Sequence, residues 1–346
     1  MRCFFAPETD LHDPIFRLTH GTVQQNAERP ERARLLKDAL AQMGFRTEEP
    51  PEAPRSALEA VHTPQFLDFL ETAWEQWQAL PGAGPEVVPN VFPARPPMGG
   101  PATYPDSIVA RAGWHMGDTS APIGKHSWNA TRRAADCAIA AADAVLEGDA
   151  AAYALCRPAG HHTGPETAAG HCLINNSAVA AARLLTRDGK VSTLDIDVHH
   201  GNGTQAIFYE RADVLCVSIH ADPADYYPFF TGHADETGGG TGAGANLNIP
   251  LPRSTTDAAW LAALRQALDA IDAFSPGALM VSLGLDAHEN DPLLGMKVTW
   301  EGFEDAGRMI AAAHYPTVLV QEGGYLSDDL TTSLVSFLRG FEAGLT

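Results

Sequence analysis

The sequence predicts a single-domain α/β protein built on a parallel β-sheet with helices on both faces. Short apolar runs typical of buried strands alternate with longer alanine-rich stretches typical of helices. The 346 residues, 45% of them hydrophobic, suffice to bury one large core, so we treat residues 1–346 as one domain. Polar motifs follow several of the apolar runs, as expected for a parallel sheet that binds ligands beyond the carboxyl ends of its strands.

The apolar runs and the alanine-rich stretches give the expected elements in order. The expected strands are 152–156, 191–198, 214–220, 278–283 and 318–321, and 246–251 is also strand-like. The expected helices are 131–146, 175–185 and 257–274. A glycine-rich run at 237–245 leads into a strand-like segment, not a helix, and no lysine follows it, so we expect a flexible loop and not a phosphate-binding loop.

A proline-rich stretch interrupts the amino-terminal half. Residues 80–105 contain eight prolines, which exclude a regular helix or a central strand there. We expect a long surface loop inserted in the domain.

Acidic and histidine side chains follow two of the expected strands. In the run 191–198, Asp197 and the following His199 are two residues apart, so on an extended strand they share a face with Cα atoms about 6.5 Å apart. Charges are rarely carried into such an apolar element unless they are paired or bind a metal. Asp286, after the run 278–283, is the natural third ligand of a catalytic zinc site with one open position.

Two further loops carry residues suited to proton transfer. His161 and His162 are adjacent in a Pro/Gly loop, and imidazole exchanges protons near neutral pH when a partner fixes its tautomer. Asp195 and Asn202 are candidates for that partner. Tyr325 follows two glycines, which allow close backbone approach, and its hydroxyl could stabilise an oxyanion.

These motifs resemble those of the zinc-dependent histone deacetylase and acetylpolyamine amidohydrolase superfamily. The tandem histidines (161–162), Asp-x-Asp-x-His-His-Gly (195–201), Gly-x-Asp (284–286) and Gly-Gly-Tyr (323–325) occur in the family's order. The resemblance implies the arginase–deacetylase fold and hydrolysis of an acetyl amide.

The resemblance also implies roles for the residues that match. Asp197, His199 and Asp286 would bind zinc, and His161 and His162 would transfer protons. The same oxygen and nitrogen ligands accept iron or cobalt.

The same resemblance implies roles for residues around the metal ligands and the tandem histidines. Tyr325 would act as the electrophilic partner, and Asn202 would orient the second histidine. Asp195 would orient the first histidine and, with Ser218 and Ile219, help to hold a structural potassium ion.

The expected substrate is a small acetylated amine, most closely as in bacterial acetylpolyamine amidohydrolases. Asp118 lies in a segment resembling that branch's acidic gate, and Tyr227 fits one wall of the substrate tunnel. Gly170 and His171 would line the opposite wall, where the family usually places Phe or Tyr in the position of His171. In that branch the resemblance implies a loop insertion that packs at a dimer interface, and residues 80–105 could serve so in a homodimer or higher homo-oligomer. The alternative is an exposed linker without such a role.

Other functions stay open or are excluded. The same chemistry fits a protein acetyl-lysine deacetylase, and a catalytically silent metal-binding protein is a further alternative. An arginase-type guanidino hydrolase shares the fold but uses a two-metal site. The tandem histidines and Tyr325 of this chain speak against that function. The net charge of −20 disfavours nucleic acid and attracts cations. Five cysteines without paired spacing and no apolar span near 20 residues predict a reduced, cytoplasmic protein without a membrane helix, and Cys172 is expected to be a buried thiol.

Overall fold

The computed structural model describes residues 1–93 and 102–346, and its centre is one eight-stranded parallel sheet. The strand order is β4-β1-β5-β10-β9-β6-β7-β8, and every adjacent pair runs parallel. A separate antiparallel hairpin, β2–β3, lies near the amino terminus. Within the described ranges, none of the helices has the length and apolar character needed to cross a bilayer.

The strands and helices have the following bounds. The strands are β1 (Arg2–Phe4), β2 (Phe16–Thr19), β3 (Thr22–Gln25), β4 (Thr47–Glu48), β5 (Ala151–Ala154), β6 (Val191–Asp195), β7 (Val214–Ala221), β8 (Asn246–Leu251), β9 (Ala278–Leu283) and β10 (Thr317–Gln321). The α-helices are α1 (Glu31–Gln42), α2 (Arg55–Leu58), α3 (Pro64–Gln78), α4 (Ile108–His115), α5 (Ser127–Leu146), α6 (Asn176–Asp188), α7 (Asn202–Phe208), α8 (Asp257–Phe274), α9 (Trp300–Ala311) and α10 (Leu330–Gly344).

Two of the helices begin where local chemistry favours a start. The Thr63 hydroxyl accepts a hydrogen bond from the backbone N–H of Phe66, and Pro64 occupies the first turn of α3. The Asn175 side chain accepts from the N–H of Ala178 at 2.8 Å and starts α6.

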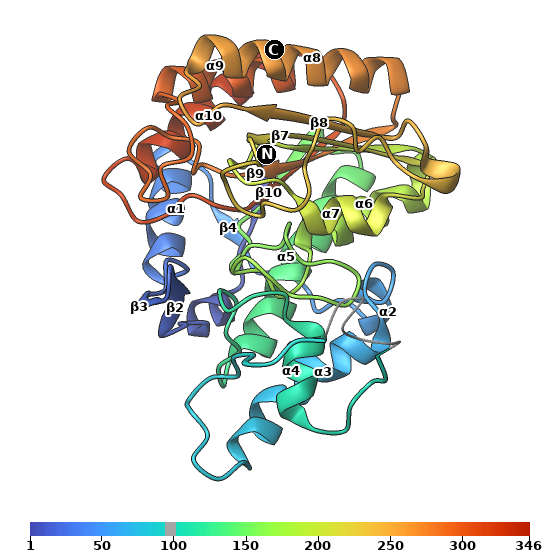
Figure 1. Ribbon diagram of the computed structural model, residues 1–346. Helices are drawn as coiled ribbons and strands as arrows, with labels where there is room; N and C mark the ends of the chain where they lie inside the picture. The colour runs from blue at the N-terminus through green and yellow to red at the C-terminus, as the bar shows by residue number, and fades with distance from the viewer. Residues whose placement is uncertain (94–101) are drawn as a thin grey trace.

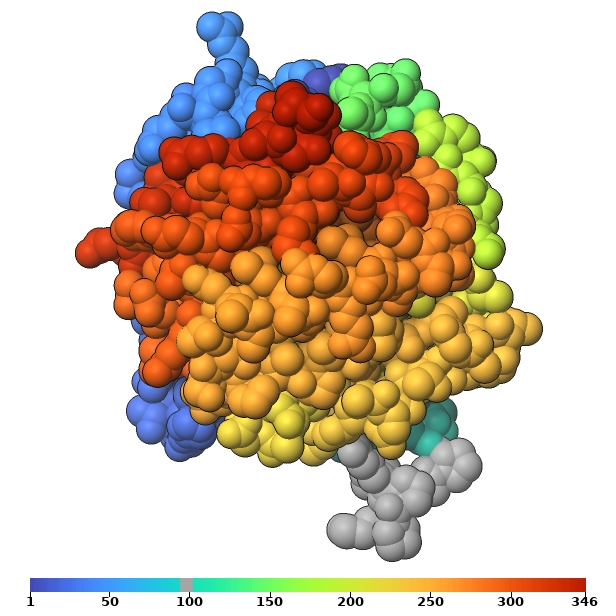
Figure 2. Space-filling view, turned by 90° about the horizontal axis from the view of Figure 1, so that it is seen from above, coloured from blue at the N-terminus to red at the C-terminus, as the bar shows by residue number. Residues whose placement is uncertain are grey.

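Helices cover both faces of the sheet, so two apolar cores form. In β10, Val318 and Val320 belong to the core beneath α5 and α6, whereas Leu319 points into the core beneath α1, α8, α9 and α10. Figure 1 shows α8–α10 on one side of the sheet and α5–α7 on the other. Figure 2 looks onto the first side, which the orange and red carboxyl-terminal segments largely cover.

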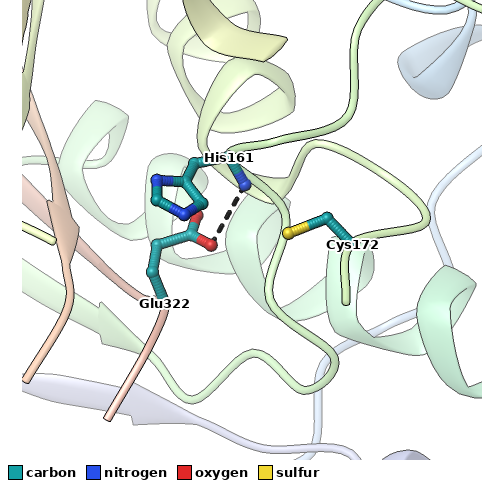
Figure 3. A group of neighbouring side chains, drawn as sticks. All are labelled: His161, Cys172 and Glu322. Carbon is teal, nitrogen blue, oxygen red and sulfur yellow. Dashed lines mark hydrogen bonds between the residues drawn. The ribbon is translucent and has the colours of Figure 1, made fainter. Parts of the chain in front are cut away.

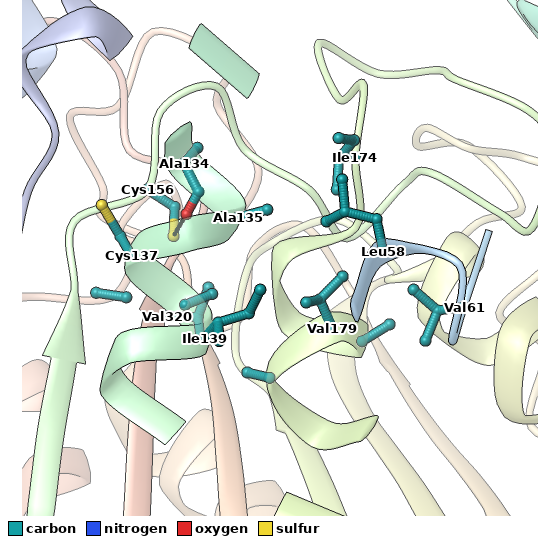
Figure 4. Packing of buried hydrophobic residues seen from close by; sticks show 14 of the residues in the cluster. Leu58, Val61, Ala134, Ala135, Cys137, Ile139, Cys156, Ile174, Val179 and Val320 are labelled. Carbon is teal, nitrogen blue, oxygen red and sulfur yellow. Dashed lines mark hydrogen bonds between the residues drawn. The ribbon is translucent and has the colours of Figure 1, made fainter. Parts of the chain in front are cut away.

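Figure 4 shows the α5 and α6 side of the core at close range. Small side chains such as Ala134 and Ala135 of α5 allow this helix to approach the sheet closely, and the thiol of Cys156 donates to the carbonyl of Ala134 at 3.2 Å. Val179 of α6 packs in the same cluster. Close apolar contacts therefore form the core on this side of the sheet.

The predicted α/β architecture is confirmed, but the strand predicted at 191–198 is too long. β6 ends at Asp195, whose Oδ1 accepts the N–H of Asp197 at 3.0 Å. Asp197 Oδ1 in turn accepts the N–H of His199 at 2.9 Å. The N–H of Ile196 still donates to the carbonyl of Ser282 at 3.1 Å, and from Asp197 onward side chains replace the sheet as acceptors, so the regular ladder ends. Ile196 and Val198 are apolar because they are buried in the loop that follows the strand.

The proline-rich insertion was predicted as a loop. Its described parts, 80–93 and 102–105, contain no helix or strand beyond an isolated bridge between Val87 and Ile123. Residues 94–101 lie outside the described residues.

The strand order brings the polar motifs together. β5, β10, β9 and β6 are consecutive neighbours in the sheet, and in parallel strands all carboxyl ends share one edge. The tandem histidines, Tyr325, Asp286 and the 195–199 segment follow these four strands in that spatial order. Four loops far apart in the sequence therefore meet at one edge.

A buried ion cluster ties the amino-terminal segment to this edge. Glu28 forms ion pairs with Arg32 and with Arg157, whose Nε lies 2.7 Å from Glu28 Oε1, and all three side chains are at most 2% exposed. Arg32 also donates to the carbonyls of Gly324 at 2.6 Å and Glu322 at 2.7 Å. Glu28 therefore supplies negative charge to two arginines that the core encloses.

We predict that Glu28→Gln lowers the free energy of unfolding by about 3–5 kcal/mol, because it leaves two buried cations without a counter-charge. Glu31→Gln is the matched control, since Glu31 is 44% exposed and its pair with Arg29 should contribute less than about 1 kcal/mol. Urea unfolding of both variants measures the difference. Equal, small losses of unfolding free energy in both variants would show that Glu28 is not needed to balance the charge of the two arginines.

Candidate active site

Three predicted metal ligands come together at the sheet edge. Asp197, His199 and Asp286 are buried, and one ligand atom of each lies within 4.8 Å of the others. The Nδ1 atom of His199 lies 3.0 Å from Asp197 Oδ1 and 3.1 Å from Asp286 Oδ2. One imidazole nitrogen and two carboxylates thus converge on one point, as predicted.

The electrostatics of these three residues fit a bound cation. Burial opposes a charged His199, yet the two carboxylates raise its pKa to about 9. Burial and the charge of Asp197 raise the pKa of Asp286. Two carboxylates enclosed this closely need positive charge between them. Nitrogen and oxygen donors in this number match a catalytic metal site that keeps a position open.

Glycine backbone closes this site from two sides. A Cβ atom on Gly323 would lie 2.3 Å from Asp286 Oδ2 and 2.5 Å from Asp197 Oδ2, and one on Gly284 would lie 2.3 Å from Asp197 Oδ2. The N–H of Gly323 donates to Asp197 Oδ2 at 2.8 Å. Any larger residue would push the carboxylates apart, so the glycines of both motifs are needed for the geometry of the ligands.

The tandem histidines have different partners, as predicted. His161 Nδ1 lies 2.9 Å from Asp195 Oδ2, and His162 Nδ1 lies 2.7 Å from the side-chain oxygen of Asn202. An amide oxygen only accepts, so the Nδ1 of His162 carries its proton and Nε2 keeps a lone pair. The two rings pack with centroids 4.0 Å apart.

The two histidines differ in charge. Burial opposes the charged form of His161, but Asp197 and Asp195 raise its pKa well above the usual range. Burial and the neighbouring charge of His161 lower the pKa of His162 far below the usual value. His162 is therefore neutral and able to accept a proton, beside a histidine that stays charged.

Tyr325 is held from three directions. Its backbone N–H donates to Asp291 Oδ2 at 2.9 Å, and the guanidinium of Arg32 lies 4.8 Å from the centre of its ring. Its hydroxyl lies 3.2 Å from Nδ1 of His171. Asp291 also accepts the N–H of Leu293 at 2.8 Å and so holds the backbone of this loop.

A cavity of about 430 Å³ gives access to these groups. Its lining includes the catalytic candidates His162 and Tyr325, the predicted ligand His199, and the predicted tunnel residues Gly170, His171 and Tyr227. Arg17, on the β2–β3 hairpin, and Arg253 line it too. A second cavity of about 490 Å³ shares His162, Tyr227 and Phe229 with the first. Tyr227 and Phe229 thus separate two spaces that both reach the neutral histidine.

Asp118 joins two walls of the cavity. Its Oδ2 accepts the N–H of Gly170 at 3.1 Å and the hydroxyl of Tyr227 at 2.7 Å, while Oδ1 accepts the N–H of Ser120 at 2.8 Å. Both oxygens of the Asp118 carboxylate therefore already accept hydrogen bonds within the protein. Its predicted gate role toward an ammonium group stays a prediction.

The residues predicted to hold potassium lie behind the metal ligands. Ser218 and Ile219 are buried in β7, and Ser218 is the register partner of Asp195 in β6. The Ser218 hydroxyl lies 2.8 Å from Nδ1 of His220. The potassium site itself stays a prediction.

The sequence did not identify the part played by Glu322. This buried carboxylate accepts the backbone N–H groups of Gly160 at 2.6 Å and His161 at 3.1 Å, and the Ser177 hydroxyl at 2.7 Å. It therefore fixes the loop that carries the tandem histidines. A carboxylate directly before Gly-Gly-Tyr, at the end of a buried strand, was the available signal.

Glu322, His161 and Cys172 form a second group with metal-binding atoms, shown in Figure 3. Glu322 is saturated by backbone and hydroxyl donors, and the thiol of Cys172 donates to the carbonyl of Gly170 at 3.4 Å. Burial raises the pKa of Cys172 well above its ordinary value, so it stays a thiol. This group supports the histidine loop, and the prediction of a buried Cys172 is confirmed.

Comparisons with known proteins agree with this geometry. The histone deacetylase domain family matches residues 26–341. The chain is 42% identical to an acetylpolyamine amidohydrolase of Burkholderia pseudomallei and 39% identical to one of Mycoplana ramosa, with at least 98% of each chain covered. A crystal structure of the Burkholderia pseudomallei enzyme superposes with a TM-score of 0.95 over 99% of both chains.

We predict that Asp286→Asn weakens zinc binding by more than about 100-fold, because it removes one charged ligand from the group of three. Asp305→Asn is the control, since Asp305 is exposed and pairs with Arg308. Competition with a chromophoric chelator measures the affinity of each variant. Wild-type affinity in Asp286→Asn would place the metal elsewhere.

Proposed function

The chain belongs to the histone deacetylase family, and we propose that it is a zinc-dependent hydrolase that removes acetyl groups from small acetylated amines, with acetylpolyamines as the leading substrates. One observation carries this proposal. The neutral His162, the metal ligand His199 and the hydroxyl-bearing Tyr325 line a single cavity. A base, a Lewis-acid site and an oxyanion donor are what amide hydrolysis requires.

The residues divide the chemistry among them. When bound, the metal would polarise the amide carbonyl and lower the pKa of a water molecule. His162 accepts the water proton on Nε2 while its Nδ1–H stays on Asn202. The Tyr325 hydroxyl donates a hydrogen bond to the carbonyl oxygen as negative charge develops there. His162 then returns the proton to the nitrogen of the leaving amine.

The charge of His161 complements this cycle. As a cation between Asp195 and Asp197 it offsets the acids, and it keeps His162 neutral until a proton arrives from water. Burial raises the pKa of Tyr325, so the phenol keeps the proton that it must donate. Each group thus begins the reaction in the protonation state that it needs.

Three lines of support favour a polyamine as the leaving amine. Relatives that align over nearly the whole chain are named acetylpolyamine amidohydrolases. The charge of −20 would draw polycations toward the molecule. The cavity of about 430 Å³, which His171 and Tyr227 help to line, offers space for an aliphatic chain. Arg17 and Arg253 in the same lining act against a cation, so the charge at the far end of the amine is the variable to test.

One alternative function uses the same chemistry. A protein acetyl-lysine deacetylase would act through the same residues and would differ in the entrance to the cavity. Structural potassium, a homodimer or higher homo-oligomer, and a cytoplasmic location remain predictions.

We predict that Tyr325→Phe lowers kcat/KM by about 10²–10³ with little change in zinc content, because one oxyanion donor is lost and no metal ligand is touched. Acetate release and zinc content are measured on the same preparation. Tyr315→Phe is the control, since its hydroxyl contacts exposed Asp272 far from the cavity. Undiminished turnover in Tyr325→Phe would remove the role.

We predict that acetylputrescine is hydrolysed with at least about tenfold higher kcat/KM than 4-acetamidobutanoate, which replaces the far ammonium by a carboxylate, and than an acetyl-lysine peptide. Arg17→Gln should raise kcat/KM for acetylputrescine about two- to fivefold at low salt, because it removes a repelling charge. Arg308→Gln, on an exposed helix face, is the matched control.

The opposite preferences have definite meanings. Preference for 4-acetamidobutanoate would show that the arginines select an anionic substrate. Preference for the peptide would support the protein deacetylase alternative.

A further inference from the structure

We propose that His171 is a positioning residue for Tyr325: its Nδ1–H donates to the phenolic oxygen and leaves the tyrosine proton directed at the carbonyl oxygen of the substrate. This inference rests on the proposed deacetylation. It gives His171 a role beyond that of a tunnel wall.

The contact is direct and enclosed. The Tyr325 hydroxyl lies 3.2 Å from Nδ1 of His171, and the ring centroids are 5.6 Å apart. The residues are 7% and 4% exposed, respectively. In the described part of the chain, His171 is the one hydrogen-bond partner of this hydroxyl. The backbone of Tyr325 is held by Asp291 and its ring by Arg32, so the hydroxyl is the part of the side chain that His171 orients.

The backbone of His171 is held in a conformation that costs energy. Its φ of +70° follows the φ of +55° at Gly170, and the turn is closed by the N–H of Cys172 on the carbonyl of Ala169 at 2.8 Å. Non-glycine residues enter this region infrequently and at an energetic cost. Asp118 anchors the same turn through the N–H of Gly170. The turn thus holds the imidazole against the tyrosine.

The imidazole has one proton to place. Burial and the positive charge of Arg17 lower the pKa of His171 to about 3, so the ring is neutral. Its Nε2 is buried and has no hydrogen-bond partner in the described ranges. A proton on Nδ1 has the phenolic oxygen as its acceptor, whereas a proton on Nε2 would be a buried N–H without one. The proton therefore belongs on Nδ1, facing Tyr325.

This tautomer determines what the tyrosine can do. A phenol that accepts from Nδ1–H keeps its own proton for the substrate, and the donated hydrogen bond stabilises charge that builds on the phenolic oxygen. In the other tautomer, Nδ1 would accept the phenolic proton and compete with the substrate. A hydrophobic ring at position 171 would leave the hydroxyl unoriented.

A double-mutant cycle with acetylputrescine tests the proposal. We expect His171→Phe to lower kcat about tenfold, as for loss of one hydrogen bond, with KM changed less than twofold. In a Tyr325→Phe background the same substitution should cost less than twofold, because no hydroxyl remains to orient.

Two matched variants keep the test independent of packing. The amide of His171→Asn occupies the place of Nδ1 and should retain at least about a third of kcat. The longer His171→Gln places its amide near the Nε2 position and should behave like His171→Phe. Thermal unfolding and zinc content are measured for every variant, and the Asn and Gln pair decides the question if His171→Phe does not fold.

Several results would overturn the inference. Equal losses from His171→Phe in both backgrounds, a change in KM without a change in kcat, or equal kcat for the Asn and Gln variants would reduce His171 to a tunnel wall. Inactivity of the unaltered protein, or full activity of Tyr325→Phe, would instead overturn the proposed function, and this inference with it.

Discussion

Enclosing three carboxylates in one sheet edge is the constraint on which the rest of the structure depends. Asp195, Asp197 and Asp286 are at most 3% exposed, and a buried anion is costly unless positive charge and donors surround it. Backbone N–H groups of the 196–199 loop and of Gly323 donate hydrogen bonds to these carboxylates. His161 and His199 lie beside them, and the arrangement of the ligand atoms could hold a metal ion. Parallel strands supply these groups together, because their carboxyl ends share an edge.

The same arrangement sets the chemistry. A carboxylate beside His161 and an amide beside His162 give two adjacent rings different charge states, so that a neutral ring and a cation lie with centroids 4.0 Å apart. Farther out, Glu322 and Arg32 fix the loops of the histidines and the tyrosine from behind. The substrate side is fixed by Asp118, which binds both walls, and by His171, which reaches the tyrosine hydroxyl. Positioning contacts therefore extend well beyond the ligands and the proton carriers.

Much of this could be predicted from local patterns. The elements 278–283, 246–251 and 257–274 have the predicted bounds, since each is a continuous run of one periodicity with clear ends. The strand predicted at 191–198 was too long, because Ile196 and Val198 are apolar residues of a buried loop and not of the strand. Two partners of Glu322 are backbone N–H groups, so the sequence offered only its position directly before Gly-Gly-Tyr as a signal. The contact of His171 with Tyr325 joins residues 154 apart through a left-handed turn, so a stacking wall was the most that the sequence offered.

The most direct test of the account is X-ray absorption at the zinc edge of the fully loaded protein, with the zinc content measured on the same sample. The account predicts one zinc per chain in a shell of oxygen and nitrogen donors at about 2.0–2.2 Å, from Asp197, His199 and Asp286. A sulfur neighbour at about 2.3 Å would place the metal at Cys172, His161 and Glu322 instead. That result would contradict the assignment of the metal ligands and of His161.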